Sequence, residues 1–181
     1  MSFESLLDRF SAAVAACDAA GFASLFTPDG AYDDYFFGEH RGRDAIAHML
    51  ERFHVGGERF RWQFVEPLAS DTLGYARYCF SYLSREPESA GALVVFEGTS
   101  RFRLSNGLIE HYAETFDRGG AFVQLGYATP RVRKLLDRYA GQFRVSEVVR
   151  EHVALRRLEG LGDGGWVSPD AGAAPGRGAA G

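Results

Sequence analysis

Lysine, cysteine and long apolar runs are scarce in this sequence, and each scarcity excludes a class of protein. Of the 20 Lys and Arg residues only Lys134 is a lysine, and with 24 Asp and Glu the net charge is −4. A chain without a basic surplus lacks the electrostatic footprint of a nucleic-acid-binding protein. The two cysteines, Cys17 and Cys79, are too few for a disulfide framework and lack metal-ligand spacing.

Two further absences concern location and cofactors. No apolar run approaches the roughly 20 residues of a membrane span, and the N-terminus, with Glu4 and Asp8, is a poor match to a secretory signal. The sequence has no Gly-rich phosphate loop, and His48, Glu51 and His54 lack the one-turn spacing of a zinc-binding helix. We therefore expect a cytoplasmic protein with no membrane, nucleic-acid, metal or cofactor partner.

Apolar and aromatic residues, in contrast, are abundant and regularly spaced. Hydrophobic residues make up 46% and aromatic residues 14% of the 181 residues, which suits one domain with a sizeable core. Apolar residues recur at helical spacing, which predicts helices over three segments: 3–14, 19–26 and 43–53. Ser2 is the expected N-cap of the first helix. Between the second and third helices we expect a turn over 27–30 and an extended segment over 31–37.

After Gly56 and Gly57 the apolar period changes to two, which predicts strands. Four strands are expected: 60–67, 73–84, 92–104 and 108–117. Helices followed by antiparallel strands predict an α+β fold, with the helices on one face of a sheet. A further helical pattern follows the strands, and the chain ends in a Gly, Ala and Pro-rich stretch. We expect three parts: a domain over 1–127, a C-terminal helical extension over 128–159 and a disordered tail over 160–181.

Two segments carry a resemblance to a known superfamily. The first, LFTPDGAYDDYFFGEHRGRDAIAHML at residues 25–50, resembles the corresponding part of ketosteroid isomerases. The second, GLIEHYAETFDRGGAFVQLG at residues 107–126, is similar to the last strand of limonene-epoxide hydrolase. With the order of helices and strands over residues 3–127, they resemble the nuclear transport factor 2-like superfamily, in particular its SnoaL-like branch.

This resemblance implies a cone-shaped half-barrel, in which three N-terminal helices pack in a curved antiparallel sheet around an apolar pocket. It also implies a small apolar molecule as ligand and a homodimer formed through the sheet face. Members of the superfamily catalyse unrelated reactions or none, so the fold by itself does not give the function.

The ketosteroid isomerase resemblance implies a general base at Asp34. That family also uses an oxyanion hole built from a Tyr and a protonated Asp. The matching positions here hold Ala13 and Ser100. Because two strong hydrogen-bond donors are missing, steroid isomerisation as such is disfavoured.

The limonene-epoxide hydrolase resemblance implies a water-activating acid at Glu114, assisted by Tyr32, with Asp34 in place of that family's Asn. Arg77 matches the Arg of the relay, but Cys79 stands where a second Asp is needed. Proton delivery to an epoxide oxygen by the same relay is therefore not supported.

Both resemblances place residues 32–34 and the last strand around one pocket. Asp34 and Glu114 would then be two carboxyls in an aromatic cavity, where desolvation and repulsion leave one protonated and one ionised near neutral pH. Such a pair suits general acid–base catalysis. We expect Asp34, Glu114 and Tyr32 to be catalytic. The residues expected to bind substrate are Arg77, His54, Tyr35, Trp62, Tyr112 and Ser100.

The sequence leaves open which faces of the strands point inward. In the last predicted strand, strict alternation puts Glu110 and Glu114 on one face and Ile109 on the other, so the apolar pattern is mixed. In the second strand either Arg77 or the aromatic face with Tyr78 points inward, and we expect Arg77 there. For Asp33, next to Asp34, we expect a turn or capping role.

The expected function is that of a SnoaL-like small-molecule enzyme with a metal-free carboxylate acid/base site, of the isomerase, dehydratase/cyclase or hydrolase type. The alternative is a non-catalytic small-molecule-binding or dimerisation domain of the same fold. Both acids together in an enclosed cavity would favour the enzyme. A ring-filled cavity with both acids in solvent would favour the alternative.

Overall fold

A computed structural model describes residues 2–158, and these divide into two compact units at the boundary between Ala128 and Thr129. The helices of the first unit are α1 (Phe3–Ala16), α2 (Ala19–Ser24), α3 (Arg43–Gly56), the 3-10 helix η1 (Pro87–Ser89) and α4 (Arg118–Gln124). Its strands are β1 (Phe26–Asp34), β2 (Gly38–Arg41), β3 (Gly57–Ala69), β4 (Leu73–Ser84), β5 (Leu93–Ser105) and β6 (Leu108–Phe116). The second unit contains α5 (Thr129–Val145) and α6 (Glu147–Leu158).

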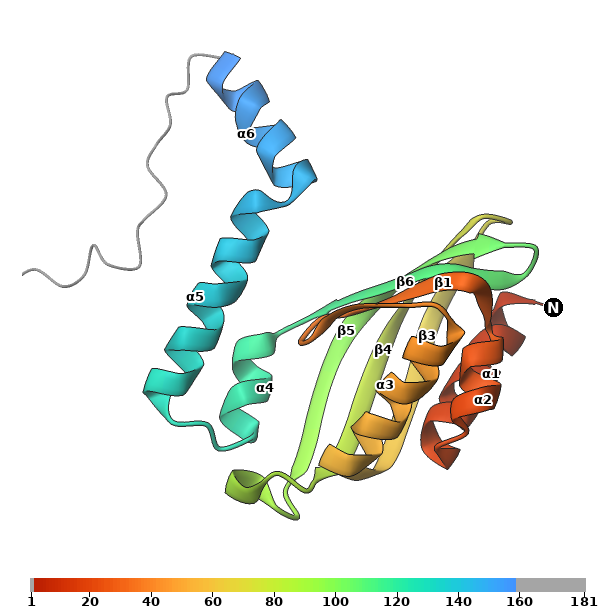
Figure 1. The fold of residues 1–181 in the computed structure, drawn as a ribbon, viewed down its shortest axis with the longest axis horizontal. Helices are drawn as coiled ribbons and strands as arrows, with labels where there is room; N and C mark the ends of the chain where they lie inside the picture. Colours follow the sequence, from red (N-terminus) through yellow and green to blue (C-terminus); the bar gives the residue numbers. More distant parts are fainter. Residues whose placement is uncertain (1, 159–181) are drawn as a thin grey trace, which may run out of the picture. The chain divides into compact units, whose positions relative to one another are not determined.

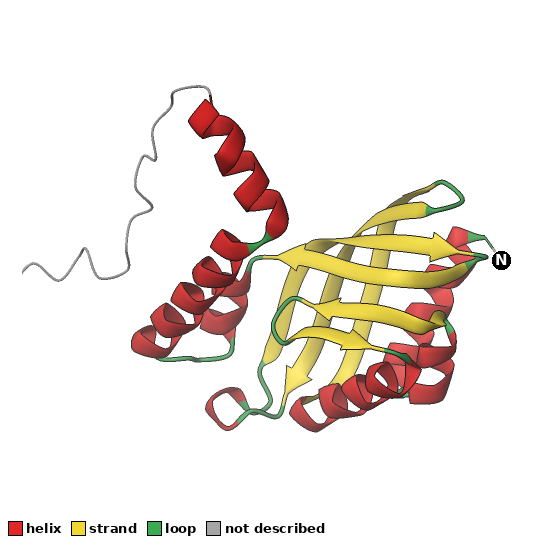
Figure 2. Cartoon of the chain, turned by 45° about the horizontal axis from the view of Figure 1, so that its top comes forward, coloured by secondary structure: helices red, strands yellow, loops and turns green. Residues whose placement is uncertain are grey.

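The predicted α+β half-barrel is confirmed in the first unit. Its strands form one curved sheet in the order β2-β1-β6-β5-β4-β3, and α1, α2 and α3 lie along one face of it (Figures 1 and 2). Neighbouring strands pair antiparallel, except that β1 and β6 run parallel. Within residues 2–158 none of the helices is both long and apolar enough to cross a bilayer.

Local sequence signals explain where the first helices begin and end. The Ser2 hydroxyl accepts a hydrogen bond from the Ser5 amide at 3.2 Å, as expected of an N-cap. Helix α2 ends at Ser24, earlier than predicted, because Phe26 already begins β1. The Arg43 guanidinium, at the start of α3, donates two hydrogen bonds to the Phe26 carbonyl oxygen, at 2.9 and 2.7 Å. This side chain fastens α3 to β1.

Several predicted boundaries differ from the structure. The predicted turn over 27–30 lies inside β1 as an irregularity, since the pairing with β6 skips from Phe26 to Ala31. Strand β2 and helix α4 were not predicted, because each is too short to show a period. The helical extension predicted over 128–159 contains two helices, α5 and α6, separated at Ser146. The predicted disordered tail lies outside the described residues.

A bulge in β6 settles which residues of this strand face the core. Arg103 pairs with His111 and Leu104 with Ile109, so Glu110 is an extra residue without a partner position on β5. The bulge brings Ile109 onto the same buried face as Tyr112. The prediction that Glu110 shares a face with Glu114 is therefore wrong, because strict alternation does not hold across a bulge.

Small residues make room for large ones on the inner face of the sheet. Gly98 on β5 lies between Tyr78 of β4 and Phe116 of β6 in the strand register. A Cβ atom at position 98 would lie 2.6 Å from the Tyr78 hydroxyl oxygen and would also overlap the Thr115 carbonyl oxygen. Only glycine therefore lets the Tyr78 ring extend across β5.

Gly98→Ala is expected to destabilise the domain by about 2–4 kcal/mol, because the overlapping Thr115 oxygen belongs to the backbone and cannot move aside cheaply. The matched control is Gly56→Ala, whose new Cβ would meet only the Glu86 carboxylate at 3.5 Å. Its unfolding free energy should stay within about 1 kcal/mol of wild type. Urea unfolding of the three proteins measures both values, and equal midpoints for the two variants would contradict the packing argument.

Candidate active site

The parallel pairing of β1 and β6 sets two carboxyl groups side by side. Tyr32 is paired with Tyr112, so Asp34 and Glu114 lie two positions further along each strand. The Tyr32 and Tyr112 rings stack with centroids 4.5 Å apart, and side chains two positions further along point to the same face. Asp34 is only 4% and Glu114 only 9% exposed. Both acids therefore lie buried on the inner face of the sheet.

Asp34 is held by the turn that follows β1. Its Oδ1 atom accepts hydrogen bonds from the amides of Phe36 at 2.7 Å and Phe37 at 2.8 Å. Burial raises the pKa of Asp34 above its ordinary value, and these two amides offset only part of that rise because they bind the charged form. The turn role predicted for Asp33 thus belongs to Asp34, and Asp33 is exposed.

Glu114 ends a chain of side-chain hydrogen bonds. The Tyr112 hydroxyl donates to Glu114 Oε2 at 3.1 Å and lies 2.9 Å from the Ser100 hydroxyl. Because Tyr112 has one proton and gives it to Glu114, Ser100 is the donor to Tyr112. Burial and the nearby Asp34 charge raise the pKa of Glu114 to about 8. Near neutral pH Glu114 therefore holds a proton.

Tyr32 and Tyr78 bring two more hydroxyl groups to this place. Both side chains are buried, and neither hydroxyl has a hydrogen-bond partner among the described residues. The Tyr78 hydroxyl lies close enough to Glu114 to lower the pKa of that acid, although it falls short of hydrogen-bond geometry. Sequence reasoning did not include Tyr78 in the site, and its pairing with Gly98 is the signal that could have found it.

The structure brings three of the predicted substrate-binding residues to the same interior and one to its rim. Ser100 and Tyr112 belong to the hydrogen-bond chain, and the Trp62 ring lies 5.1 Å from the Tyr78 ring and 6.3 Å from the Tyr112 ring. Tyr35 lies in the turn after Asp34. The Arg118 guanidinium lies over the Tyr35 ring in a cation–π contact, with its Cζ atom 3.3 Å from the ring centroid.

Arg77 and His54 are not brought to the two acids. The Arg77 side chain is 54% exposed and donates to Glu66 at 3.1 Å, so the prediction that it points inward is wrong. The physical reason is that Tyr78, its neighbour, packs into the core and forces Arg77 outward. His54 Nε2 lies 2.9 Å from the Val14 carbonyl oxygen, so the imidazole forms a hydrogen bond that links α3 to α1.

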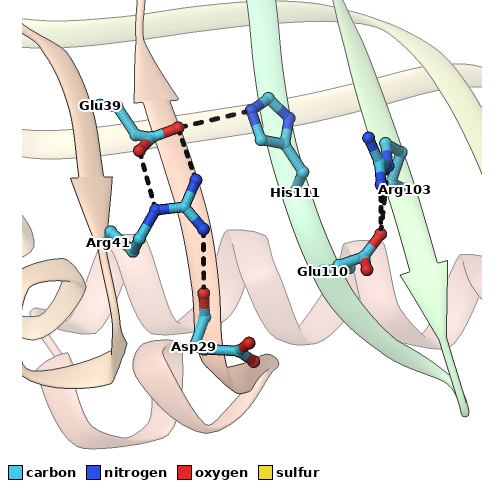
Figure 3. A network of polar contacts seen from close by, with 6 residues as sticks. All are labelled: Asp29, Glu39, Arg41, Arg103, Glu110 and His111. Carbon is cyan, nitrogen blue, oxygen red and sulfur yellow. Dashed lines mark hydrogen bonds and ion pairs between the residues drawn. The ribbon is translucent and has the colours of Figure 1, made fainter.

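The outer face of β2, β5 and β6 carries several ion pairs. Arg41 forms an ion pair with Glu39 at 3.0 Å, and Arg103 forms one with Glu110 at 2.9 Å. Figure 3 shows both pairs. Among residues 2–158, by contrast, neither Asp34 nor Glu114 forms an ion pair. Buried acids without an ion-pair partner have perturbed proton affinities, which are common at catalytic sites.

A groove of about 300 Å³ lies between α1 and β3. Its lining residues are Leu7, Asp8, Ser11, Arg61, Trp62, Gln63 and Phe64. Of the predicted site residues only Trp62 lines it, so the enclosed pocket expected at the two acids stays a prediction. The described part of the chain contains no group of three or more His, Cys, Asp and Glu side chains placed to hold a metal ion.

Comparison with known proteins defines the class. A family model described as the SnoaL-like domain matches residues 7–112, and the chain therefore belongs to the SnoaL-like domain family. The match includes Asp34 and stops before Glu114. A search of curated proteins finds no match.

Solved structures with the same fold come from several bacteria. A hypothetical protein with a ketosteroid isomerase-like fold from Catenulispora acidiphila, in complex with trimethylamine, has a TM-score of 0.64 at 15% identity, covering 70% of this chain and 96% of that one. A proposed polyketide cyclase from Xanthomonas campestris has a TM-score of 0.57 at 21% identity, covering 67% and 95%. An epoxide hydrolase of M. tuberculosis, described as LEH-like, has a TM-score of 0.56 at 18% identity, covering 67% and 86%. At these identities the likeness establishes the fold and not the reaction.

Glu114→Gln should stabilise the domain against alkaline pH. Because the folded pKa of Glu114 is raised to about 8 from 4.5, the folded chain keeps a proton that the unfolded chain loses, and stability falls as pH rises through this window. Gln does not titrate. The free energy of unfolding of the variant, relative to that of wild type, should therefore increase between pH 5 and pH 9, by at most about 4 kcal/mol.

The control for this measurement is Glu110→Gln, which removes an exposed carboxylate from the bulge on the outer face. Urea unfolding of all three proteins at pH 5, 7 and 9 gives the comparison. If wild type and Glu114→Gln lose stability equally on going to pH 9, Glu114 does not hold a proton in the folded state.

Proposed function

We propose that this SnoaL-like domain is an acid–base enzyme that moves a proton at a carbon next to a carbonyl group of a small apolar substrate. The observation that supports this is the difference between its two buried acids. Burial raises the pKa of both acids, but two backbone amides offset part of the rise for Asp34, whereas the pKa of Glu114 is raised to about 8. Near pH 7 the pair therefore contains one base and one acid.

The proposed reaction begins with proton abstraction. Asp34 takes the proton from the carbon, and the electron pair of the broken C–H bond forms an enolate whose negative charge develops on the carbonyl oxygen. Glu114 donates its proton to that oxygen, which stabilises the charge where it appears. If a C=C bond is conjugated with the enol, Asp34 returns its proton to the far carbon of the dienol while the hydroxyl proton goes back to Glu114, which re-forms the carbonyl group and gives isomerisation. If the enol carbon instead attacks a second carbonyl group, a C–C bond forms and closes the ring, the enol hydroxyl proton returns to Glu114, and the new alkoxide takes the proton held by Asp34.

Hydrolysis by the relay of limonene-epoxide hydrolases is less well supported. That relay needs an Arg and a second acid next to the water-activating acid, and the matching residues here, Arg77 and Cys79, are both exposed. An isomerase or cyclase needs only the base and the acid that are buried. The structural neighbour described as a proposed polyketide cyclase is consistent with this class.

A second candidate function, a non-catalytic binding or dimerisation domain, is favoured by the rings that fill the interior. Phe10 of α1 packs against the rings of Trp62 at 5.1 Å and Tyr112 at 5.3 Å. Such packing leaves little room for a ligand beside Tyr112. The burial of both acids argues for the enzyme, because a dimerisation domain gains nothing from a desolvated carboxyl pair.

We also propose a cytoplasmic homodimer formed through the outer face of the sheet. Several large apolar side chains on that face are exposed: Val65, Leu68, Leu73, Tyr75, Leu93 and Val95. Exposed apolar patches commonly mark protein interfaces. Native mass spectrometry of the purified chain tests the dimer, and a monomer at micromolar concentration would contradict it.

The acid–base proposal predicts a specific loss of proton exchange. Wild type should catalyse incorporation of deuterium from D2O into members of a panel of small cyclic ketones, followed by NMR. Asp34→Asn removes the base and should slow exchange by about 10²–10⁴-fold. The rate should also decline above pH 8, because Glu114 then loses the proton that it donates.

The matched control is Asp33→Asn, which changes the adjacent but exposed carboxylate and should leave the exchange rate within about twofold of wild type. Loss of exchange in both variants, or in neither, would mean that Asp34 is not the base. Ketone binding without exchange in any protein would favour the non-catalytic alternative.

A further inference from the structure

Three buried side-chain hydroxyl groups among the described residues lack a partner in hydrogen-bond geometry, those of Thr27, Tyr32 and Tyr78, and the two tyrosines lie near the acid Glu114. Tyr32 and Tyr78 are 0% and 1% exposed, and their nearest polar groups, the Tyr112 hydroxyl and the Glu114 carboxyl respectively, lie outside hydrogen-bond geometry. A buried donor left without an acceptor costs roughly 1–3 kcal/mol, and such groups are rare unless they serve a ligand or a bound water. Both lie near Glu114, whose charge would raise the pKa of each tyrosine further.

The two hydroxyl groups approach the region next to Glu114 from different strands of the sheet. On one side Tyr78 extends across Gly98, and the next row of the sheet holds only the small residues Ala76 and Ser100 before Glu114. On the other side Tyr32, from β1, is held by stacking on Tyr112. On the inner face the small residues Ala76, Ser100 and Gly98 thus lie between Tyr78 and Glu114.

We propose that Tyr32 and Tyr78 are the specificity-determining residues of the site and that their hydroxyls bind one oxygen atom of the substrate, so that the domain selects apolar ketones. This inference rests on the proposed function, since the oxygen bound is the one on which the enolate charge develops. Burial raises the pKa of both tyrosines, so both keep their protons and act only as donors toward an acceptor oxygen. They supply the hydrogen bonds that Ala13 and Ser100 do not.

The test compares two ligands that differ mainly in one oxygen, 1-tetralone and tetralin, by isothermal titration calorimetry. Wild type should bind the ketone about 10–100-fold more tightly than the hydrocarbon, as two hydrogen bonds allow. Tyr78→Phe and Tyr32→Phe should each reduce this preference by about 3–10-fold, and the double variant should reduce it further, leaving only what the Glu114 proton contributes. Tetralin should bind all four proteins equally, which also shows that the variants are folded.

Two further variants make the result specific. Tyr75→Phe removes a hydroxyl from the exposed outer face and should keep the full preference for the ketone. Asp34→Asn removes the proposed base but not the two donors, so it should lose deuterium exchange and keep the preference. Failure of the acid–base chemistry is thereby separated from failure of oxygen binding.

Three outcomes would overturn the inference. Wild type binding both ligands equally would mean that the hydroxyls serve a buried water or Glu114 itself. A preference that is as large in the double variant as in wild type would place the oxygen elsewhere. Binding of neither ligand would show that the site does not take apolar ketones.

Discussion

The burial of two carboxyl groups on neighbouring parallel strands is the constraint on which the site depends. Parallel strands need a long crossover, and here α3 and the strands β2 to β5 all lie between β1 and β6 in the sequence. Desolvating two carboxylates is unfavourable, and the structure offsets it locally. Two amides of the turn after β1 bind Asp34, and the Tyr112 hydroxyl binds Glu114. Aromatic rings around Tyr112 keep water out, which in turn keeps a proton on Glu114 near neutral pH.

Much of the fold could be predicted because its longer elements have a clear apolar period. The period of helix α1 and that of strand β4 are both regular in the sequence, and their order resembles that of a known superfamily. The bulge in β6 and the short strand β2 could not be predicted, because they depend on contacts with neighbouring strands and not on the local sequence. The bulge at Glu110 reverses the faces of β6 partway along the strand, so an unbroken alternation put Ile109 on the wrong side. The short strand β2 exists because it pairs with β1, not because its own residues favour a strand.

The positions of the candidate residues were predicted in part, and the errors have one common cause. The resemblance led us to expect Asp34 and Glu114 near one another, and the register of β1 with β6 places them side by side. For β4, both faces were plausible from sequence, and the choice is made by packing: Tyr78 fits inward only because its neighbour on β5 is Gly98. Arg77 is outward as a consequence. A residue's direction is thus decided by the size of its partner on the next strand, which a single-strand pattern does not include.

The central claim is that the acid pair holds one proton near neutral pH and that Glu114 carries it. The most direct measurement is a pH titration of the side-chain carboxyl carbons by NMR with 13C-labelled Glu and Asp, using Glu114→Gln to assign the resonance. The account predicts a Glu114 midpoint near pH 8, well above that of the surface glutamates. A midpoint for Glu114 near pH 4.5 would contradict the claim and remove the proton donor from the proposed reaction.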